Sequence, residues 1–375
     1  MLETLQVIWF ILWALLWAVY FVLDGFDLGL GSLLPFIGSN EEERRIMYNA
    51  AGPFWDGNEV WLISAGGVTF AAFPKVYAVM FSALYAPLLI LLFALIFRAV
   101  SFEFRGKVES GVWRGFWDLV HFLSNLVPSL LLGVTFANLF MGIPIDGEGV
   151  FHGTLMGLVN GYGIAGAIFF LVMFMLHGSL WLAIKSQGEL QTRAVASATL
   201  LWPVMLILLV AFLVLTFFNT DLFSNYWSNP LLLLLPVVAL AGLLGVRCML
   251  RRGQLWKAWM CSAVYIIGVT FFGVMGMFPR MLISSIDPTA TLTAFNASSS
   301  ELTLKIMLGV ALVMVPIVLL YQFWVYRLFS HSLSAEDLKD EHAYSQRRSV
   351  RLIEPGRQAC PVRRAFFMPA AGIGG

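Results

Sequence analysis

Four acidic residues within apolar sequence are the first candidates for chemistry in this chain. Asp24 and Asp27 end one long apolar run, and Asp56 and Glu59 begin the next. Each pair is spaced by three residues, so its two carboxyls share one face of a helix. A carboxylate near the centre of a bilayer costs roughly 2.5–3.5 kcal/mol, so such groups usually face a protein interior or a wet path. The pattern therefore predicts a buried functional cluster.

Helix capping is the alternative explanation for these acids. Negative side chains are favoured in the first turn of a helix, and Gly52-Pro53 just before Asp56 is typical of a helix start. At the depth of the lipid headgroups such acids would cost little. Two pairs in consecutive apolar runs, each among glycines and aromatic residues, favour the buried cluster instead.

A charged pair after the third apolar run is the candidate for a proton entrance. Glu103 and Lys107 are four residues apart with the acid first, which is the favourable order if the segment is helical. The alternative is a solvated surface pair that contributes little. The excess of basic residues predicts that this pair and Asp56 both lie on the cytoplasmic side of the membrane. We therefore predict that the pair collects protons from the cytoplasm.

The histidines and cysteines give little indication of a metal site. His121 and His177 lie in two different apolar runs and are a weak alternative as haem ligands. A role as polar packing groups between helices is the favoured interpretation. Cys248, Cys261 and Cys360 form no C-x-x-C pair, which argues against structural zinc or an iron–sulfur cluster. We expect no metal and no cofactor-binding residue in this chain.

Membrane-spanning helices must position these residues. Of the 375 residues, 59% are hydrophobic and 12% charged, against about 25% charged in an average soluble domain. A helix needs about 20 mainly apolar residues to cross the hydrocarbon core. Such stretches fall at residues 5–23, 54–73, 76–98, 116–140, 157–183, 195–218, 230–247, 258–279 and 303–327. The sequence therefore predicts an all-α polytopic membrane protein with about nine transmembrane helices.

The lysines and arginines predict the orientation of these helices. Cytoplasmic loops carry an excess of both residue types. With nine spans, all 23 of them except Lys75, Arg280 and Lys305 fall on one side, and Arg98 is counted there as a loop residue. The N-terminus is therefore predicted to lie outside and the C-terminus in the cytoplasm.

The chain divides into a membrane domain and a tail. Residues 1–344 are predicted to form one membrane-embedded domain. Residues 345–375 hold six arginines and one glutamate together with several prolines and glycines, and they are predicted to form a basic, disordered cytoplasmic tail. The net charge of +1, with its charges separated by side, gives no indication of nucleic-acid binding.

Several motifs with characteristic spacing carry a resemblance to a known family. They are DGFDLG (24–29), EERRIM (42–47), WDGNEVWL (55–62), FEFR (102–105), WRGFWD (113–118), MFP (277–279) and NASSSELTL (296–304). Because these motifs occur in this order and with this spacing, the chain resembles subunit II of the cytochrome bd-type quinol oxidases. The resemblance covers roughly residues 5–344.

This resemblance implies a function and partners. The family's complex oxidises quinol, reduces oxygen to water and generates a proton motive force across the bacterial inner membrane. Subunit I, the expected partner in a heterodimer, holds two b-type haems and haem d. Subunit II ligates no haem iron and stabilises subunit I. A small single-span accessory subunit, membrane lipid and a structural quinone or lipid in a groove are further expected components.

The resemblance also implies roles for individual residues. Asp56 matches the family's membrane-embedded aspartate on the proton path. Glu103 and Lys107 match an acid and a lysine at the cytoplasmic entrance. Trp61 matches a tryptophan beside the oxygen route. Glu59 stands where the family often has glutamine, which adds an acid near the path.

Two other classes of function compete with the oxidase subunit. A secondary transporter also places charged groups inside the membrane, but it predicts inverted repeats with broken helices at the midplane, which the sequence does not show. A purely structural membrane subunit would use the same acids only to hold helices together. A substitution at Asp56 separates that alternative from a proton path.

Overall fold

The computed structural model describes residues 1–333, so the predicted tail at 345–375 lies outside the described residues. Within residues 1–333 the chain is helical apart from loops and one small two-stranded sheet. In chain order the elements are α1 (Leu2–Ile37), α2 (Glu41–Ala51), α3 (Trp55–Ala72), α4 (Pro74–Ala83), α5 (Tyr85–Phe104), α6 (Gly111–Met141), α7 (Leu155–Leu158), α8 (Gly161–Lys185), α9 (Gly188–Asn219), α10 (Phe223–Ser228), η1 (Pro230–Leu233), α11 (Leu234–Arg251), α12 (Leu255–Met277), β1 (Arg280–Leu282), η2 (Pro288–Ala290), β2 (Leu292–Thr293) and α13 (Glu301–Leu328).

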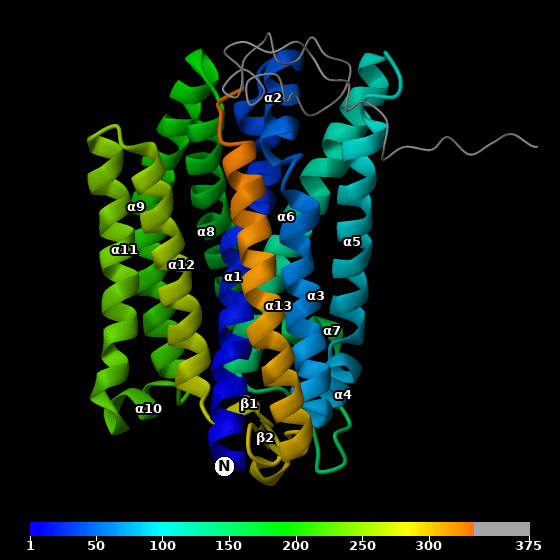
Figure 1. Cartoon of the computed structure of the whole chain (residues 1–375), viewed down its shortest axis with the longest axis vertical. Coiled ribbons are helices and arrows are strands. Elements are labelled where there is room, and N and C mark those ends of the chain that lie inside the picture. Colours follow the sequence, from blue (N-terminus) through cyan, green and yellow to red (C-terminus); the bar gives the residue numbers. More distant parts are fainter. Residues whose placement is uncertain (334–375) are drawn as a thin grey trace, which may run out of the picture.

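Eight helices of the described chain are long and apolar enough to cross a membrane, which confirms the predicted all-α polytopic fold. They are α1, α5, α6, α8, α9, α11 with η1, α12 and α13. The predicted second span corresponds to α3, which is not one of these eight but runs beside α13 in Figure 1. The count of nine spans and the orientation therefore stay predictions.

Helix α1 is longer than the sequence predicted. The first span was expected to end at residue 23, but the helix continues through Asp24 and Asp27 to Ile37. At 1.5 Å per residue its 36 residues reach about 54 Å, well beyond the roughly 30 Å of a hydrocarbon core. Both carboxyls have partners inside the bundle, so they do not interrupt the helix.

The predicted third span, 76–98, lies in two helices rather than one. Helix α4 ends at Ala83 and α5 begins after a single residue. Pro87 has no N–H to donate to the carbonyl of Ala83, and its ring crowds that carbonyl, so a continuous helix is disfavoured there. The tight turn expected around Pro74 is confirmed, because α3 ends at Ala72 and α4 begins at Pro74.

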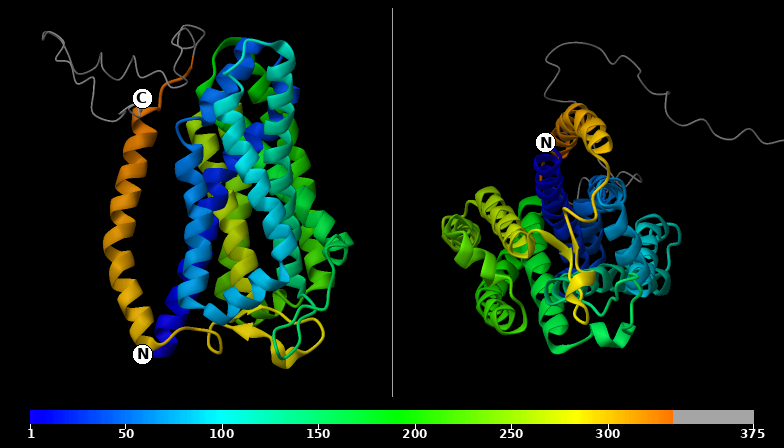
Figure 2. Two further views of the ribbon diagram at one scale, coloured as in Figure 1. Left: turned by 90° about the vertical axis from the view of Figure 1, so that its right-hand side faces the viewer. Right: turned by 90° about the horizontal axis from the view of Figure 1, so that it is seen from below.

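The helices form an upright bundle around α1, which contacts α3, α6, α8 and α12 (Figure 1). In that view α2 lies at the upper end of the bundle, and the N-terminus lies at the lower end with the β1–β2 hairpin. Helix α13 stands apart from the other helices along most of its length (Figure 2). Leu304 is the one residue of α13 that is fully buried within the described chain.

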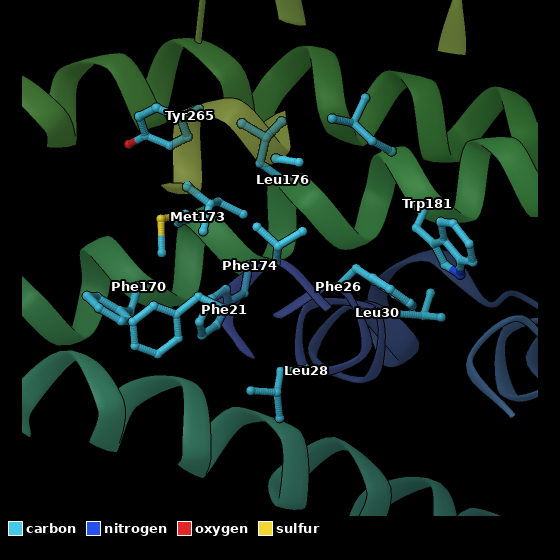
Figure 3. Packing of buried hydrophobic residues seen from close by; sticks show 14 of the residues in the cluster. Phe21, Phe26, Leu28, Leu30, Phe170, Met173, Phe174, Leu176, Trp181 and Tyr265 are labelled. Atoms are coloured by element: carbon cyan, nitrogen blue, oxygen red, sulfur yellow. The ribbon is translucent and has the colours of Figure 1, made fainter. Parts of the chain in front are cut away.

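Close packing of α1 against α8 fixes the centre of the bundle. A Cβ atom added at Gly29 would come within 1.8 Å of the carbonyl oxygen of Phe174, so only glycine allows this approach of the two backbones. The ring of Phe26 stacks on Trp181 with 4.4 Å between the centroids, and Figure 3 shows both among the buried side chains of this region. The α1 backbone that carries the acids is therefore held rigidly.

Candidate functional site

A fully buried arginine joins two of the predicted acids. The guanidinium of Arg98, on α5, lies 2.8 Å from a carboxylate oxygen of Asp24 on α1 and 2.8 Å from one of Glu59 on α3. The side chains of Arg98 and Asp24 are 0% exposed, and that of Glu59 is 22% exposed. Three helices thus meet at one ion-paired group. Burying charges is costly unless they are paired in this way.

Asp27 is held by an amide rather than by a cation. Asn58, on α3, donates a hydrogen bond of 2.7 Å to the Asp27 carboxylate. The amide oxygen of Asn58 in turn accepts from the hydroxyl of Tyr326 at 3.0 Å and from the amide of Gln322 at 3.3 Å. Both of these residues belong to α13. The same polar group that holds Asp27 therefore also attaches the outlying helix to the bundle.

The position predicted for Arg98 was wrong. The sequence analysis counted it as a cytoplasmic loop residue, but it lies inside α5, six residues before the helix ends at Phe104. An arginine this close to the end of an apolar run is ambiguous, because its long side chain can reach either the headgroups or the interior. Here the carboxyls of Asp24 and Glu59 draw it inwards.

A hydrogen-bonded link leads from Arg98 towards the upper end of the bundle. The hydroxyl of Ser101 donates to the carbonyl oxygen of Arg98 at 2.6 Å and lies 2.8 Å from Nδ1 of His121, on α6. Since that hydroxyl already donates its proton, Nδ1 of His121 is the donor to Ser101. Ser101 and His121 are both buried.

A second ion-paired group lies one helical turn beyond His121. Asp118 contacts Nε of Arg105 at 2.5 Å and the guanidinium of Arg44 at 3.0 Å, and Arg105 also binds Glu41 at 2.9 Å. The phenol of Tyr48 packs under Arg105 at 4.9 Å from the ring centroid, and burial raises the pKa of this phenol, so it stays neutral. We call the series from this group through His121 and Arg98 to Asp27 the polar column.

The predicted entrance residues and Asp56 lie at the surface of the chain. Glu103 and Lys107 are exposed near the upper end of the bundle, but they form no ion pair with each other in the described structure. Helix α5 ends at Phe104, so the helical spacing on which that pair depended is absent. Asp56 is exposed in the first turn of α3, on the same stripe as the apolar Val60. Buried surroundings for Asp56 are therefore not provided by this chain itself.

An apolar cavity of about 720 Å³ opens beside the polar column between α1, α3, α4, α5 and α6. Glu59 is the charged residue of its lining, and the indole rings of Trp13 and Trp17 form part of the wall. Trp61 is not in the lining: its side chain is buried, and its Nε1 donates to Gln322 at 3.0 Å. Leu62, the next residue, does face the cavity.

Both ring nitrogens of His177 have partners within the chain, which does not fit haem ligation by this residue. Nδ1 of His177 lies 3.0 Å from the hydroxyl of Ser262, and Nε2 lies 3.0 Å from the carbonyl oxygen of Val22. A carbonyl only accepts, so Nε2 carries the proton and Nδ1 accepts from Ser262. His121 is bound to Ser101 as described. Among residues 1–333 no cluster of three histidine, cysteine or acidic side chains could hold a metal ion.

Comparison with known proteins decides what kind of protein carries this arrangement. Residues 5–329 match the family model described as cytochrome bd terminal oxidase subunit II. The chain belongs to this family. It is 37% identical over 340 residues to cytochrome bd ubiquinol oxidase subunit 2 of Bacillus subtilis (strain 168), which covers 90% of this chain and 99% of the relative. It is 33% identical over 368 residues to cytochrome bd-I ubiquinol oxidase subunit 2 of Escherichia coli (strain K12), over 90% and 97% of the two chains.

A solved structure has the same fold. A chain in the structure of bd oxidase from Geobacillus thermodenitrificans superposes with a TM-score of 0.72 at 15% identity, over 87% of this chain and 98% of that chain. As a cytochrome bd subunit II, this chain is part of a terminal oxidase, an oxidoreductase of the bacterial inner membrane with haem in the complex and a subunit I as partner. The resemblance found in the sequence is thereby confirmed.

The acids of the site stand out in the sequence, but their partners do not. The basic residues around Arg98 predict a loop position for it, and no sequence pattern predicts a role for Asn58, Ser101 or Asp118. One signal was available: Asn58 lies within the WDGNEVWL motif, one residue from Glu59 and on the helix face opposite Asp56. That face is the buried one.

Proposed function

We propose that this chain serves a quinol:oxygen oxidoreductase by carrying protons along the polar column towards the haem-bearing partner. In this proposal quinol is oxidised, oxygen is reduced to water, and protons taken from the cytoplasm generate the membrane potential. The names of the relatives, which are ubiquinol oxidase subunits, support quinol as the electron donor. Subunit I carries two b-type haems and haem d, and a small single-span subunit completes the complex.

The observation that carries the proposal is a series of buried polar groups between the two ion-paired groups. Asp118, His121 and Ser101 lie along the α5–α6 contact, and Ser101 joins His121 to the backbone carbonyl oxygen of Arg98. From Arg98 the series continues to Asp24 and Glu59. Ionisable residues inside a membrane are expensive, and they commonly mark proton relays in pumps and transporters.

The charge balance of the inner end of the column suits proton exchange. The group holds three carboxyls and one guanidinium: Asp24 and Glu59 contact Arg98, and Asp27 is held by Asn58. Arg98 compensates one negative charge, so the group becomes electrically neutral only when two protons are bound as well. A low-dielectric interior favours that neutral state. The carboxyls of this group can therefore take up and release protons while the charge of Arg98 stays in place.

Asp56, Glu103 and Lys107 complete the proposed route at the surface. The exposed Glu103 and Lys107 are placed to exchange protons with water at the cytoplasmic mouth, each on its own rather than as a pair. Asp56 lies one helical turn from Glu59 on the exposed face of α3. We propose that the partner subunit covers this face and that Asp56 passes protons across the contact.

The apolar cavities suit oxygen and a structural quinone or lipid. Oxygen is an apolar molecule, and the 720 Å³ cavity is apolar apart from Glu59 and a few neutral polar groups in its lining. Trp61, fixed by Gln322, borders the cavity through its neighbour Leu62. A second cavity of about 280 Å³ is lined by phenylalanine and aliphatic side chains between α1, α6, α8, α9, α11 and α12. This lining suits the chain of a structural quinone or lipid.

Substitution of Asp24 tests the proposal, because this carboxyl faces Arg98 at the inner end of the polar column. Asp24→Asn keeps the size of the side chain and an oxygen that accepts from Arg98 but cannot carry a proton, so quinol-driven oxygen consumption by the complex should fall at least about tenfold. The visible haem spectrum checks that the complex has assembled. Asp221→Asn, at an exposed acid (73% side-chain exposure), is the matched control and should leave the rate unchanged. A normal rate in the Asp24 variant would mean that the polar column only holds helices together.

A further inference from the structure

A basic pocket of about 470 Å³ lies between α9 and the upper end of α11, away from the polar column. Its lining consists of Trp202, Leu244, Arg247, Cys248, Arg251 and Arg252, and we call it the arginine pocket. It is distinct from the apolar cavities described above, because three of its six lining residues are permanently charged.

The three guanidiniums of this pocket lack anionic partners among residues 1–333. Arg247 is half-buried, and its guanidinium lies over the ring of Trp202 at 5.7 Å from the centroid. Arg251 and Arg252 are exposed at the end of α11. Cations are favoured at the C-terminal end of a helix. That preference explains their sequence position, but it does not explain why they surround a hollow.

The depth of the arginine pocket corresponds to a membrane–water interface. Helix α11 has no charged residue before Arg247, and the pocket begins there. Helix α9 has none after Arg193, so Trp202 stands near the start of its apolar length. The indole Nε1 of Trp202 donates to the carbonyl oxygen of Leu243 at 2.6 Å and so fixes the two helices to each other. Tryptophan is enriched at this depth of the bilayer.

A separate apolar cavity lies farther along the same two helices. The 280 Å³ cavity is lined by Leu206 and Val210 of α9 and by Val237 and Leu240 of α11. Leu240 lies one helical turn, about 6 Å, before Leu244 in the wall of the arginine pocket. A headgroup-sized basic site and an apolar site therefore follow each other along one groove.

We propose that the arginine pocket binds the phosphodiester headgroup of an anionic phospholipid and that one acyl chain follows the α9–α11 groove into the 280 Å³ cavity. Planar guanidiniums match the oxygen atoms of a phosphate in pairs. Basic pockets between transmembrane helices are known to hold anionic lipid headgroups. The lipid fills space between two helices that are otherwise largely exposed. The inference does not depend on the proton route.

Lipid binding by the intact, detergent-solubilised complex tests this site. Native mass spectrometry of the delipidated complex, titrated with phosphatidylglycerol, should show bound lipid. Each basic side chain near a membrane surface contributes about 1 kcal/mol to the attraction of anionic lipid, so Arg247→Gln/Arg251→Gln should bind roughly thirtyfold more weakly. The single variant Arg251→Gln, at an exposed position, should show a smaller loss in the same direction without any risk to folding.

Controls separate a lipid site from other sources of the same chemistry. Lys75→Gln/Arg114→Gln removes the same charge elsewhere and should bind phosphatidylglycerol like the unaltered complex. Phosphatidylcholine with the same acyl chains should bind less well, and inorganic phosphate at millimolar concentration should not displace the lipid. Equal binding by the pocket variants, equal binding of phosphatidylcholine, or displacement by phosphate would each overturn the proposal.

Discussion

Arg98 organises the interior of this protein at the scale of single residues. Its guanidinium is the cation that contacts the carboxyls of Asp24 and Glu59, and its side chain is fully buried within the described chain. Breaking a buried ion pair by removing one partner leaves an uncompensated charge, which costs more than the pair contributed. The arginine is therefore a structural requirement for any proton function of the acids.

Replacement of Arg98 should be far more damaging than replacement of a surface arginine. Arg98→Met leaves the carboxyls without their cation, so we expect a loss of roughly 3–5 kcal/mol, or failure to assemble. Arg114→Met removes a guanidinium that is 34% exposed and 3.6 Å from Glu41, and it should cost at most about 1 kcal/mol. Thermal unfolding of the two complexes measures the difference. Equal melting temperatures would contradict the role given to Arg98.

Asp56 should matter for turnover rather than for assembly. Asp56→Asn keeps the shape of the side chain and its ability to cap α3 but cannot relay a proton as a carboxyl does. We expect normal haem content and at least about tenfold slower quinol-driven oxygen consumption. Lys107→Ala should have a smaller effect, because water reaches this exposed end of the bundle by other routes. Wild-type turnover of the Asp56 variant would reduce this residue to a helix cap.

Residue spacing was enough to find the buried acids but not their partners. Asp24, Asp27 and Glu59 stand out because carboxyls are costly in apolar sequence, whatever the tertiary structure. Which cation compensates them depends on how α1, α3 and α5 are placed side by side, and one sequence does not contain that information. For the same reason the sequence could not show that Asp56 faces away from Glu59's partner.

At the scale of helices, glycine controls how closely α1 and α8 approach. Gly29→Ala would place a methyl group 1.8 Å from the carbonyl oxygen of Phe174, so the helices must separate. Overpacking of this kind costs typically 1–3 kcal/mol. Gly115→Ala, on α6 with nothing within 4 Å of the new atom, should be neutral or slightly stabilising. Thermal unfolding of both complexes checks this. A Gly29 variant as stable as the Gly115 variant would contradict the close packing.

Helix type was easier to predict than helix ends. Long apolar runs identify spans because lipid excludes unpaired backbone groups. The end of α1 was misplaced by 14 residues, from 23 to 37, because polar residues with buried partners resemble a helix terminus in sequence. The break between α4 and α5 was missed, although Pro87 signals it.

At the scale of the whole molecule, this chain is built to be one part of a larger assembly. Helix α13 has a single buried residue within the described chain, and its hydrogen bonds to α3 are made by Asn58 and Trp61. We expect that the chain, expressed without a subunit I, aggregates or does not give a monodisperse species in detergent. Size-exclusion chromatography measures this. A folded, monodisperse single chain would contradict the prediction.

Orientation is the second prediction at this scale. In a background without Cys248, Cys261 and Cys360, single cysteines at Lys107 and Arg251 should react with an impermeant maleimide only from the cytoplasmic side. A cysteine at Glu148, in the loop after α6, should react only from outside. These positions follow the excess of basic residues at the upper end of the bundle. Labelling of position 107 from outside would rule out the nine-span arrangement.

The central claim is that protons pass through the polar column of this subunit, and proton uptake during a single turnover measures that most directly. The fully reduced complex is mixed with oxygen, and a pH-sensitive dye follows proton uptake while the haem spectrum follows oxidation. We predict that Asp24→Asn, with normal haem content, takes up protons at least about tenfold more slowly than the unaltered complex. Proton uptake by this variant at the unaltered rate would show that protons do not pass through the polar column.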